Sequence, residues 1–498
     1  MRRWSQLFAA TILSASFAFA GPALSQPRDT LVVGLQQEPT SLDPTADATA
    51  SIDTIMSGNV FETLTTSSER GEVLPLLAKS WDVSADGRVY TFHLNEGVKF
   101  TDGEVLDSAV VKFAIDRAMA PDSVNPSKGI FSSIAAIETP DPLTVVVRLK
   151  EPDAYFLNSM TMGDAAIVHP KTAATNKTNP VGSGVYKLKQ WAKGDRVVLE
   201  RNQAHRDAAK AALREVTFRV MPDPTAATAA LMSGDVDAFP TIPAPETVEQ
   251  FRKDARFKVV VGTTEGEVIL ALNNGKKPLN DVRVRQAISH SLVRQDIIDG
   301  AQAGLATPIG SHFPPHNPAY VDLTGRYPHD IAKARALLKD AGYPNGLELS
   351  LQAPPFPYAR RSAEIIAQQL AEAGINVKLV NVEFPFWLAE VYKKKNYDMT
   401  IIAHTAPRDL GNYANGPEYF YGYDSPKFRE MFADFRRTVD PAQQKAKLGD
   451  LQRFIADEAV HGFLFQLPQV GVYKADLKGY WTNAPELLMP LVTISWVK

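Results

Sequence analysis

The chain has 498 residues, 45% of them hydrophobic, so it is long enough to form two or three domains with sizeable cores. A formal net charge of −3 excludes the broad basic surface that nucleic-acid-binding and anionic membrane-binding proteins present. There is no cysteine, which excludes disulfides, zinc–thiolate sites, a cysteine nucleophile and a lipid-modified N-terminal cysteine.

Residues 1–25 have the pattern of a secretory signal peptide. Arg2 and Arg3 precede an apolar run over residues 7–20, which is too short to span a bilayer well. Small residues at suitable spacing predict cleavage after Ser25, with Ala20 as the alternative. We therefore expect a soluble periplasmic protein that is not anchored by lipid.

The first α/β pattern begins with an apolar strand over residues 30–35. The polar loop that follows carries Glu38, Pro39 and Thr40. Open α/β sheets bind ligands beyond the carboxyl ends of their strands, so this loop is a candidate ligand contact. A turn built by its two prolines explains the same residues equally well.

A compact α+β unit is predicted over residues 62–170. Two stretches with alternating hydrophobicity flank Asp86 and Gly87, a pair typical of a hairpin turn. An amphipathic helix over 107–119 and a strand over 144–149 follow.

Later segments alternate strands with helices, which predicts a second α/β region. We expect strands over 268–273, 347–352, 376–380, 399–403 and 462–466, and helices over 281–298, 330–341, 360–373, 426–437 and 441–458.

The loop after the strand at 399–403 is the second candidate site. It carries His404, Arg408 and Asp409 and leads into a group of aromatic residues that begins with Tyr413. Both charge signs beside many rings suit a polar small molecule with apolar parts, although a solvated loop in which Arg and Asp pair is equally consistent. Phe386 and Trp387 could stack on a sugar or pack in the core.

No set of residues has the spacing of a known catalytic or metal-binding motif. The nine histidines are scattered, and none forms a pair with ligand spacing on an expected helix. We therefore predict no enzyme activity, no metal and no cofactor.

Seven segments in order resemble the family 5 extracellular solute-binding proteins, the peptide, dipeptide, nickel and oligosaccharide receptors of ABC importers. Examples are EPTSLDP at 38–44 and LAKSWDVSADGRVYTFHLNEGVKFTDG at 77–103. The other matching segments are 179–186, 230–237, 281–298, 333–346 and 367–379.

The resemblance implies an α/β, two-lobed periplasmic-binding-protein fold that closes on its ligand like a flytrap, with an extra α+β domain inserted in lobe I. The implied boundaries are 26–62, 172–268 and 480–498 for lobe I, 63–171 for the extra domain and 269–479 for lobe II.

The resemblance also implies site residues. Peptide-binding members use the loop that corresponds here to Glu38, Pro39 and Thr40, and hold the peptide ammonium with an aspartate whose nearest match is Asp409. The arginine with which dipeptide receptors clamp the carboxylate aligns with Ala353, so a standard dipeptide is not the first expectation. The implied ligands are a modified peptide, an opine-like conjugate or an oligosaccharide.

The predicted function is that of a monomeric periplasmic receptor that captures an oligopeptide-like or related polar solute and delivers it to ABC permease subunits, without nucleic acid as a partner. A secreted hydrolase of peptides or glycosides and a periplasmic chaperone or sensor partner remain as alternatives.

Overall fold

The computed structural model describes residues 28–405 and 408–497. The predicted signal peptide over residues 1–25 lies outside them. Within the described part, no helix combines the length and the apolar character needed to cross a bilayer.

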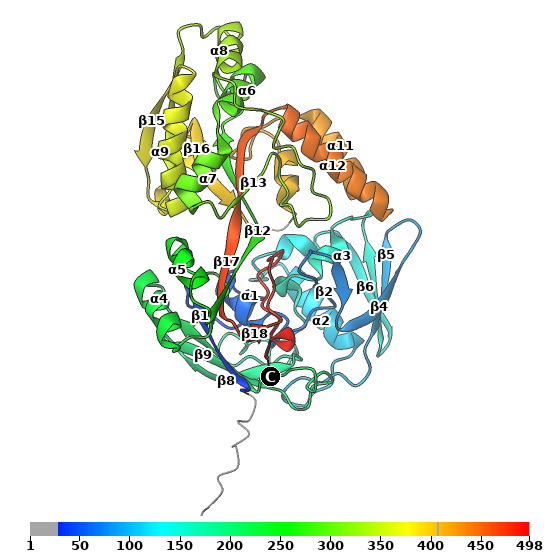
Figure 1. The fold of residues 1–498 in the computed structure, drawn as a ribbon. Coiled ribbons are helices and arrows are strands. Elements are labelled where there is room, and N and C mark those ends of the chain that lie inside the picture. The colour runs from blue at the N-terminus through cyan, green and yellow to red at the C-terminus, as the bar shows by residue number, and fades with distance from the viewer. Residues whose placement is uncertain (1–27, 406–407, 498) are drawn as a thin grey trace, which may run out of the picture.

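One mixed sheet of 11 strands runs through both lobes of the molecule (Figure 1). Its strand order is β15-β14-β16-β12-β17-β11-β1-β10-β9-β8, and β13 pairs with β17 beside this path. β12 (Phe257–Leu272) and β17 (His461–Lys474) lie in the middle and are long enough to belong to both lobes. They connect the lobes, which confirms the two-lobed fold class.

The first lobe contains the end of the sheet that begins at the N-terminus. Most side chains of β1 are buried, and the strand pairs in parallel with β10. Parallel strands are usually covered on both faces, which explains the apolar sequence of β1. Its elements are β1 (Thr30–Leu35), α1 (Ala50–Met56), β8 (Tyr186–Ala192), β9 (Arg196–Arg201), β10 (Glu215–Val220), α4 (Pro224–Ser233), β11 (Ala238–Phe239) and α5 (Val248–Arg252).

The inserted domain is an antiparallel four-stranded sheet, ordered β4-β5-β7-β6, that α2 contacts at β6 and β7. β4 and β5 pair across the predicted hairpin turn at Asp86 and Gly87. The domain comprises β2 (Thr65–Ser67), β3 (Val73–Pro75), β4 (Ala78–Val83), β5 (Val89–Leu94), α2 (Ser108–Met119), η1 (Lys128–Phe131), β6 (Ile134–Asp141), β7 (Thr144–Leu149), α3 (Phe156–Ser159) and η2 (Gly163–Ala165).

The second lobe carries the other end of the long sheet, with helices packed around it (Figure 1). Its elements are α6 (Val282–Ser291), α7 (Arg294–Gln302), β13 (Thr307–Pro308), α8 (Ile331–Asp340), β14 (Leu347–Ala353), α9 (Pro357–Glu372), β15 (Ile375–Asn381), α10 (Phe384–Phe386), η4 (Trp387–Lys393), β16 (Met399–His404), η5 (Asp409–Ala414), α11 (Pro426–Arg436) and α12 (Pro441–Asp457).

The two connecting strands are irregular where the lobes meet. The register of β12 against β17 shifts between Thr263 and Glu267, as a β-bulge does. The C-terminal segment then lies against this place, because the amide of Ala484 donates to the carbonyl of Thr263. Gly262 permits that approach, since a Cβ there would lie 1.8 Å from the carbonyl oxygen of Thr482. The chain then ends with β18 (Leu477–Lys478), η6 (Leu491–Thr493) and β19 (Ser495–Trp496).

The helix predicted over residues 281–298 is wrong as a single element. α6 ends at Ser291 and α7 begins at Arg294, with Val293 between them in an extended conformation. The side chain of Gln369 bonds both the amide and the carbonyl of Val293, so a tertiary contact replaces the helical hydrogen bonds there. The predicted domain boundaries remain predictions. They assign residues 472 and 473 of β17 to lobe II, although these residues pair with β11 of the first lobe.

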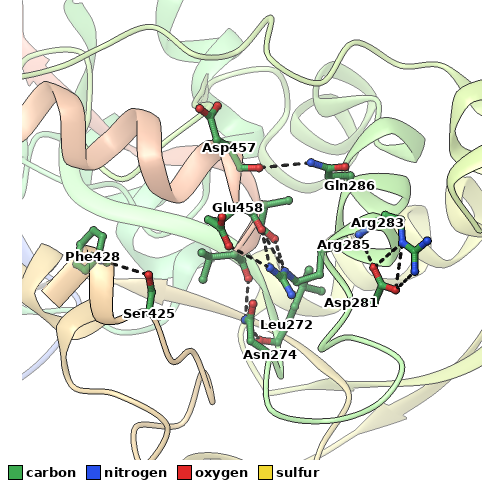
Figure 2. Close-up of polar contacts among 12 residues, drawn as sticks. Leu272, Asn274, Asp281, Arg283, Arg285, Gln286, Ser425, Phe428, Asp457 and Glu458 are labelled. Carbon is green, nitrogen blue, oxygen red and sulfur yellow. Dashed lines mark hydrogen bonds and ion pairs between the residues drawn. The ribbon is translucent and has the colours of Figure 1, made fainter. Parts of the chain in front are cut away.

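A buried arginine joins two helices of the second lobe (Figure 2). Arg285 of α6 is 4% exposed and donates to the carbonyls of Leu279, Glu458 and Ala459. The last two lie just after α12, where carbonyls have no partner within the helix. The guanidinium therefore satisfies backbone groups that would otherwise be buried without hydrogen bonds.

The second lobe also touches the inserted domain, at the end of α11. Arg436 pairs with Asp153 at 2.6 Å, and its backbone carbonyl accepts from the amide of Ala154 at 2.9 Å. The guanidinium also lies 5.5 Å from the ring centre of Tyr155. Because Asp153 is 7% exposed, this contact is better shielded than a surface ion pair.

We expect Arg436→Ala to weaken this contact by about 1–2 kcal/mol, since it removes both the ion pair and the cation–π contact. Small-angle X-ray scattering of the protein without added ligand should show a larger or broader distribution of lobe separations. Arg437→Ala is the control, because the neighbouring side chain is exposed. Identical scattering curves for the two variants would contradict the expectation.

Candidate ligand-binding cleft

A cavity of about 380 Å³ lies where the lobes and the connecting strands meet; we call it the hinge cavity. Gln302 and Thr405 reach it from the second lobe, and Thr241 and Ile242 reach it from the first. Its remaining lining residues are Asp53, Met162, Gly163, Asp164, Pro245, Thr264, Glu265, Gly266, Leu467, Pro468, Val470, Ala484, Pro485, Glu486, Leu487 and Leu488. Groups from both lobes thus line one space.

Two further cavities adjoin the hinge cavity and share residues with it. The first-lobe cavity, of about 240 Å³, is lined among others by Gln36, Gln37 and Gln469, and it shares Thr264 and Glu486 with the hinge cavity. The outer cavity, of about 180 Å³, is lined among others by Tyr155, Asn317, Arg408 and Lys445, and it shares Glu265 and Pro485. Together they form a cleft along the connecting strands, which we call the cleft below.

Acidic side chains gather in the hinge cavity. Burial, with the nearby charges of Asp164 and Glu486, raises the pKa of Asp53 to about 7, although the hydroxyl of Ser57 bonds its carboxylate. Burial likewise raises the pKa of Asp164 and of Glu486. Gly163 leaves room for Asp53, since a Cβ there would lie 2.0 Å from Asp53 Oδ1. In their ionised forms these carboxylates therefore repel one another within the hinge cavity.

Glu486 connects the C-terminal segment with the inserted domain and the second lobe. Its Oε1 accepts from the hydroxyl of Thr161 at 2.5 Å and lies 3.7 Å from Arg408 Nη2. Its Oε2 is buried and accepts no hydrogen bond within the described residues.

Glu265 extends from the irregular part of β12 toward a histidine of the second lobe. Its Oε1 lies 2.7 Å from His316 Nε2, and the other ring nitrogen of His316 lies 2.5 Å from the hydroxyl of Thr263. Both side chains are nearly buried. The pair holds the bulge of β12 against the loop that contains His316.

Behind the cleft, a chain of buried ionisable groups runs through the second lobe. His312 Nε2 lies 2.8 Å from Asp409 Oδ1, and His312 Nδ1 lies 2.6 Å from Glu267 Oε1, at an angle that makes no hydrogen bond. Asp409 Oδ2 lies 3.2 Å from His404 Nδ1, and His404 Nε2 lies 2.8 Å from the hydroxyl of Tyr421. Both carboxylate oxygens of Asp409 therefore have partners inside the protein.

The electrostatic interactions among these buried groups determine which of them carry a proton. Burial alone would lower the pKa of His312, but the carboxylates of Glu267 and Asp409 outweigh burial and raise it to about 10. Burial opposes ionisation of Asp409 as well, yet His312 and His404 bring its pKa below the ordinary value. Burial raises the pKa of Glu267 well above the ordinary value. At neutral pH we therefore expect an imidazolium at His312 beside an ionised Asp409.

Glu267, His312 and Asp409 are close enough in space to hold a metal ion, with one ligand atom from each within 4.8 Å of the others. Both ring nitrogens of His312 already face carboxylates. A metal would have to take one of these nitrogens and break an ion pair, so the observed geometry is that of a bridging imidazolium.

The first predicted site loop reaches the cleft through its beginning. Glu38 accepts from the amide of Gly194 at 2.6 Å, Pro39 is buried, and the hydroxyl of Thr40 bonds Asp47 and Thr49. These three are not among the lining residues of the three cavities. Gln36 and Gln37, immediately before them, do line the first-lobe cavity.

The second predicted site divides between the cleft and the core. Arg408 lines the outer cavity, and Thr405, next to His404, lines the hinge cavity. His404 and Asp409 lie behind the cleft, in the ionic chain described above. Their direct contact with a ligand stays a prediction.

The aromatic candidates lie in different surroundings. Trp387 is 4% exposed and donates from Nε1 to the hydroxyl of Thr400 at 2.9 Å, and Tyr413 is 1% exposed. Both belong to the core of the second lobe. Phe386 is 51% exposed and is not among the lining residues of the three cavities.

Sequence reasoning missed the acidic residues of the cleft. Asp53, Asp164, Glu265 and Glu486 are spread over almost the whole chain and share no local motif. The one usable signal is the polar stretch at 263–267, which interrupts a long β-branched and apolar run and thereby indicates an irregular strand.

The family model of the bacterial extracellular solute-binding proteins, family 5 (middle region), matches residues 72–428, more than half of the chain. The chain belongs to this family. Its members bind solutes, and the chain is accordingly a substrate-binding protein of the type that serves ABC importers, as its sequence predicts.

Relatives support the assignment over nearly the full length. The glutathione-binding protein GsiB of Salmonella paratyphi A is 29% identical over 494 residues, covering 95% of each chain. GsiB of Escherichia coli K12 is also 29% identical, covering 95% of this chain and 94% of the relative.

Two solved structures share the fold. The periplasmic binding protein AgaA of A. tumefaciens R10, in complex with agropinic acid, is 27% identical with a TM-score of 0.76 and covers 94% of this chain and 99% of its own. DppA of Helicobacter pylori, in complex with the peptide STSA, has the same identity and TM-score, covering 95% and 99%.

Proposed function

We propose that this protein captures a peptide-like or opine-like polar solute in the periplasm, between its two lobes, and delivers it unchanged to the transmembrane subunits of an ABC importer. The first 25 residues would direct its export, and it would act as a monomer without enzyme activity or cofactor.

The observation that carries this proposal is the hinge cavity itself. Thr241 and Ile242 line it from the first lobe and Gln302 and Thr405 from the second, so a solute there would touch both at once. A solute that contacts both lobes favours the conformation in which they lie together, which couples binding to closure. The permease can then distinguish a loaded protein from an empty one by shape.

The relatives limit the range of solutes. Proteins similar over nearly their whole length are named for glutathione or were solved with agropinic acid or the peptide STSA. All three are small polar molecules with amide or amino-acid chemistry. The alternative of a hydrolase would be supported by turnover of a peptide or glycoside panel by the pure protein.

Native mass spectrometry of the protein purified from its own host tests the proposal. We expect a one-to-one complex with a small molecule that is released on unfolding with its mass unchanged. Added at 100 times its dissociation constant, that molecule should stabilise the protein by about 2.7 kcal/mol. A released molecule that differs from the one bound, or an uptake rate that does not depend on this protein, would contradict the proposal.

A further inference from the structure

The hinge cavity has an uneven balance of charge. Four carboxylate residues line it, namely Asp53, Asp164, Glu265 and Glu486, and none of its described lining residues is lysine, arginine or histidine. His316 already pairs with Glu265, and Arg408 lies 3.7 Å from Glu486, whereas Asp53 and Asp164 form no ion pair within the described residues. Carboxylates brought together at low dielectric repel one another, so a further cation placed beside Asp53, Asp164 and Glu486 would lower their energy.

One of these carboxylates has a free, buried oxygen. The side chain of Glu486 is 5% exposed, and Thr161 and Arg408 both approach its Oε1. Its Oε2 has no hydrogen-bond partner within the described residues, although Glu486 lines both the hinge cavity and the first-lobe cavity. A buried acceptor without a donor is costly, so a ligand that brings an N–H group should be favoured there.

A second unpartnered acceptor lies beside the first-lobe cavity. Gln469 is 9% exposed, lines that cavity, and its Oε1 accepts no hydrogen bond within the described residues. Glu486 and Gln469 thus both have unpartnered acceptor oxygens and both line the first-lobe cavity. An ammonium or guanidinium group carries several donors at one place and can serve both.

The rest of the hinge cavity is apolar. Met162, Ile242, Leu467 and Val470 line it together with Leu488. An alkyl chain that ends in a cation would bury its methylenes on these side chains while its charge faces the carboxylates.

Charges of the opposite sign lie in the adjoining outer cavity, where Arg408 and Lys445 are among the lining residues. A zwitterionic solute could place its cationic end in the hinge cavity and its carboxylate near these two side chains.

We propose that the hinge cavity is a subsite for a cationic group of the solute, an ammonium or guanidinium at the end of an apolar chain, and that Glu486 Oε2 is its principal acceptor, with Asp53, Asp164 and Glu265 around it. The inference rests on the proposed function and names its substrate class: peptide-like solutes with a basic side chain.

Equilibrium dialysis against a mixture of alanine tripeptides tests the subsite. Each tripeptide carries lysine, norleucine or glutamate at one position in turn, and the retained peptides are quantified by mass spectrometry. Norleucine has the same straight chain as lysine without the charge. We expect the wild-type protein to retain a lysine peptide over its norleucine counterpart by about tenfold or more.

Two variants locate the effect. Glu486→Gln keeps an acceptor for Thr161 but removes the charge, and it should reduce the preference for lysine to about twofold or less. Glu383→Gln, an exposed site in the second lobe, is the matched control and should retain the full preference. Thermal unfolding of the unliganded variants checks that both are folded.

The outcomes separate this inference from the proposed function. Equal retention of lysine and norleucine peptides, preference for glutamate, or no retention of any peptide overturns the cationic subsite, as does a full lysine preference in Glu486→Gln. The proposed function is refuted separately, if protein from its own host carries no solute or returns an altered one.

Discussion

Replacing Arg285 by methionine is expected to lower the free energy of unfolding by about 3–5 kcal/mol, because a buried guanidinium is removed from three backbone carbonyls. Methionine fills much of the space of the arginine stem but has no donor for the carbonyls of Leu279, Glu458 and Ala459. Those oxygens would stay buried without partners. Urea unfolding followed by circular dichroism measures the change.

The control for this prediction lies on the same helix. Arg283 pairs with Asp281 (Figure 2). It also donates to the carbonyl of Asp340, but its side chain is 46% exposed. Arg283→Met should cost about 1 kcal/mol or less, because water can replace the lost contacts. If the two substitutions had equal effects, the buried contacts of Arg285 would not contribute as argued.

The second large effect is expected at His312. His312→Gln removes the positive charge that pairs with the buried carboxylate of Asp409 and should destabilise the protein by about 3 kcal/mol or more. Asp409 would keep His404 and Asn412 as partners, whereas Glu267 would lose the nearest charge that opposes its protonation. Urea unfolding at neutral pH, compared with the exposed variant His329→Gln, measures the difference.

The stability of the protein should depend on pH because of the same histidine, His312. The pKa of His312 is about 10 in the folded protein against an ordinary 6.5, so its contribution is complete below pH 6.5 and is lost as the pH rises toward 10. Glu267, whose pKa is raised from 4.5 by burial, changes stability in the same direction as the pH rises. Asp409, whose pKa is lowered, contributes above its ordinary value of 3.8 and loses that contribution as the pH falls.

Nitrogen NMR of the histidine rings tests this protonation directly. At about pH 8, where a free imidazole is neutral, both ring nitrogens of His312 should carry protons. A neutral His312 ring at this pH, or a wild-type stability that is flat between neutral pH and about pH 10, would contradict the assignment.

The local elements of the fold follow from the sequence because their causes are local. The apolar run at 399–403 forms β16, and the helices expected over 330–341 and 360–373 end just before Gly342 and Gly374, both of which have a positive φ. The two-lobed architecture is predicted by the family resemblance, which depends on seven motifs in the same order along the chain.

The connecting strands show where local reasoning stops. The sequence predicts strands only over residues 268–273 and 462–466. In the structure β12 already begins at Phe257, and β17 continues to Lys474. Thr264, Glu265 and Gly266 line the hinge cavity, and the register shift between Thr263 and Glu267 interrupts the strand, which masks the period on which the prediction depends.

The site shows a second limit. Aromatic residues serve cores and ligand sites alike, so the sequence could not decide between these roles for Trp387 and Tyr413, which lie in the core. The resemblance implies that Asp409 holds a ligand ammonium, and nothing in the local sequence indicates that His312, from a distant loop, contacts one of its oxygens. Because Asp409 pairs with His312, Asp409→Asn is expected to lower stability as well as any affinity. Contacts between segments far apart in the sequence leave no local pattern.

A crystal structure of the complex purified from the native host tests the central claim most directly. It should show density for a small molecule in the hinge cavity, in contact with Thr405 or Gln302 on one side and with Glu486 on the other. Density for the molecule outside this cavity, or contacts with one lobe alone, would contradict capture between the lobes.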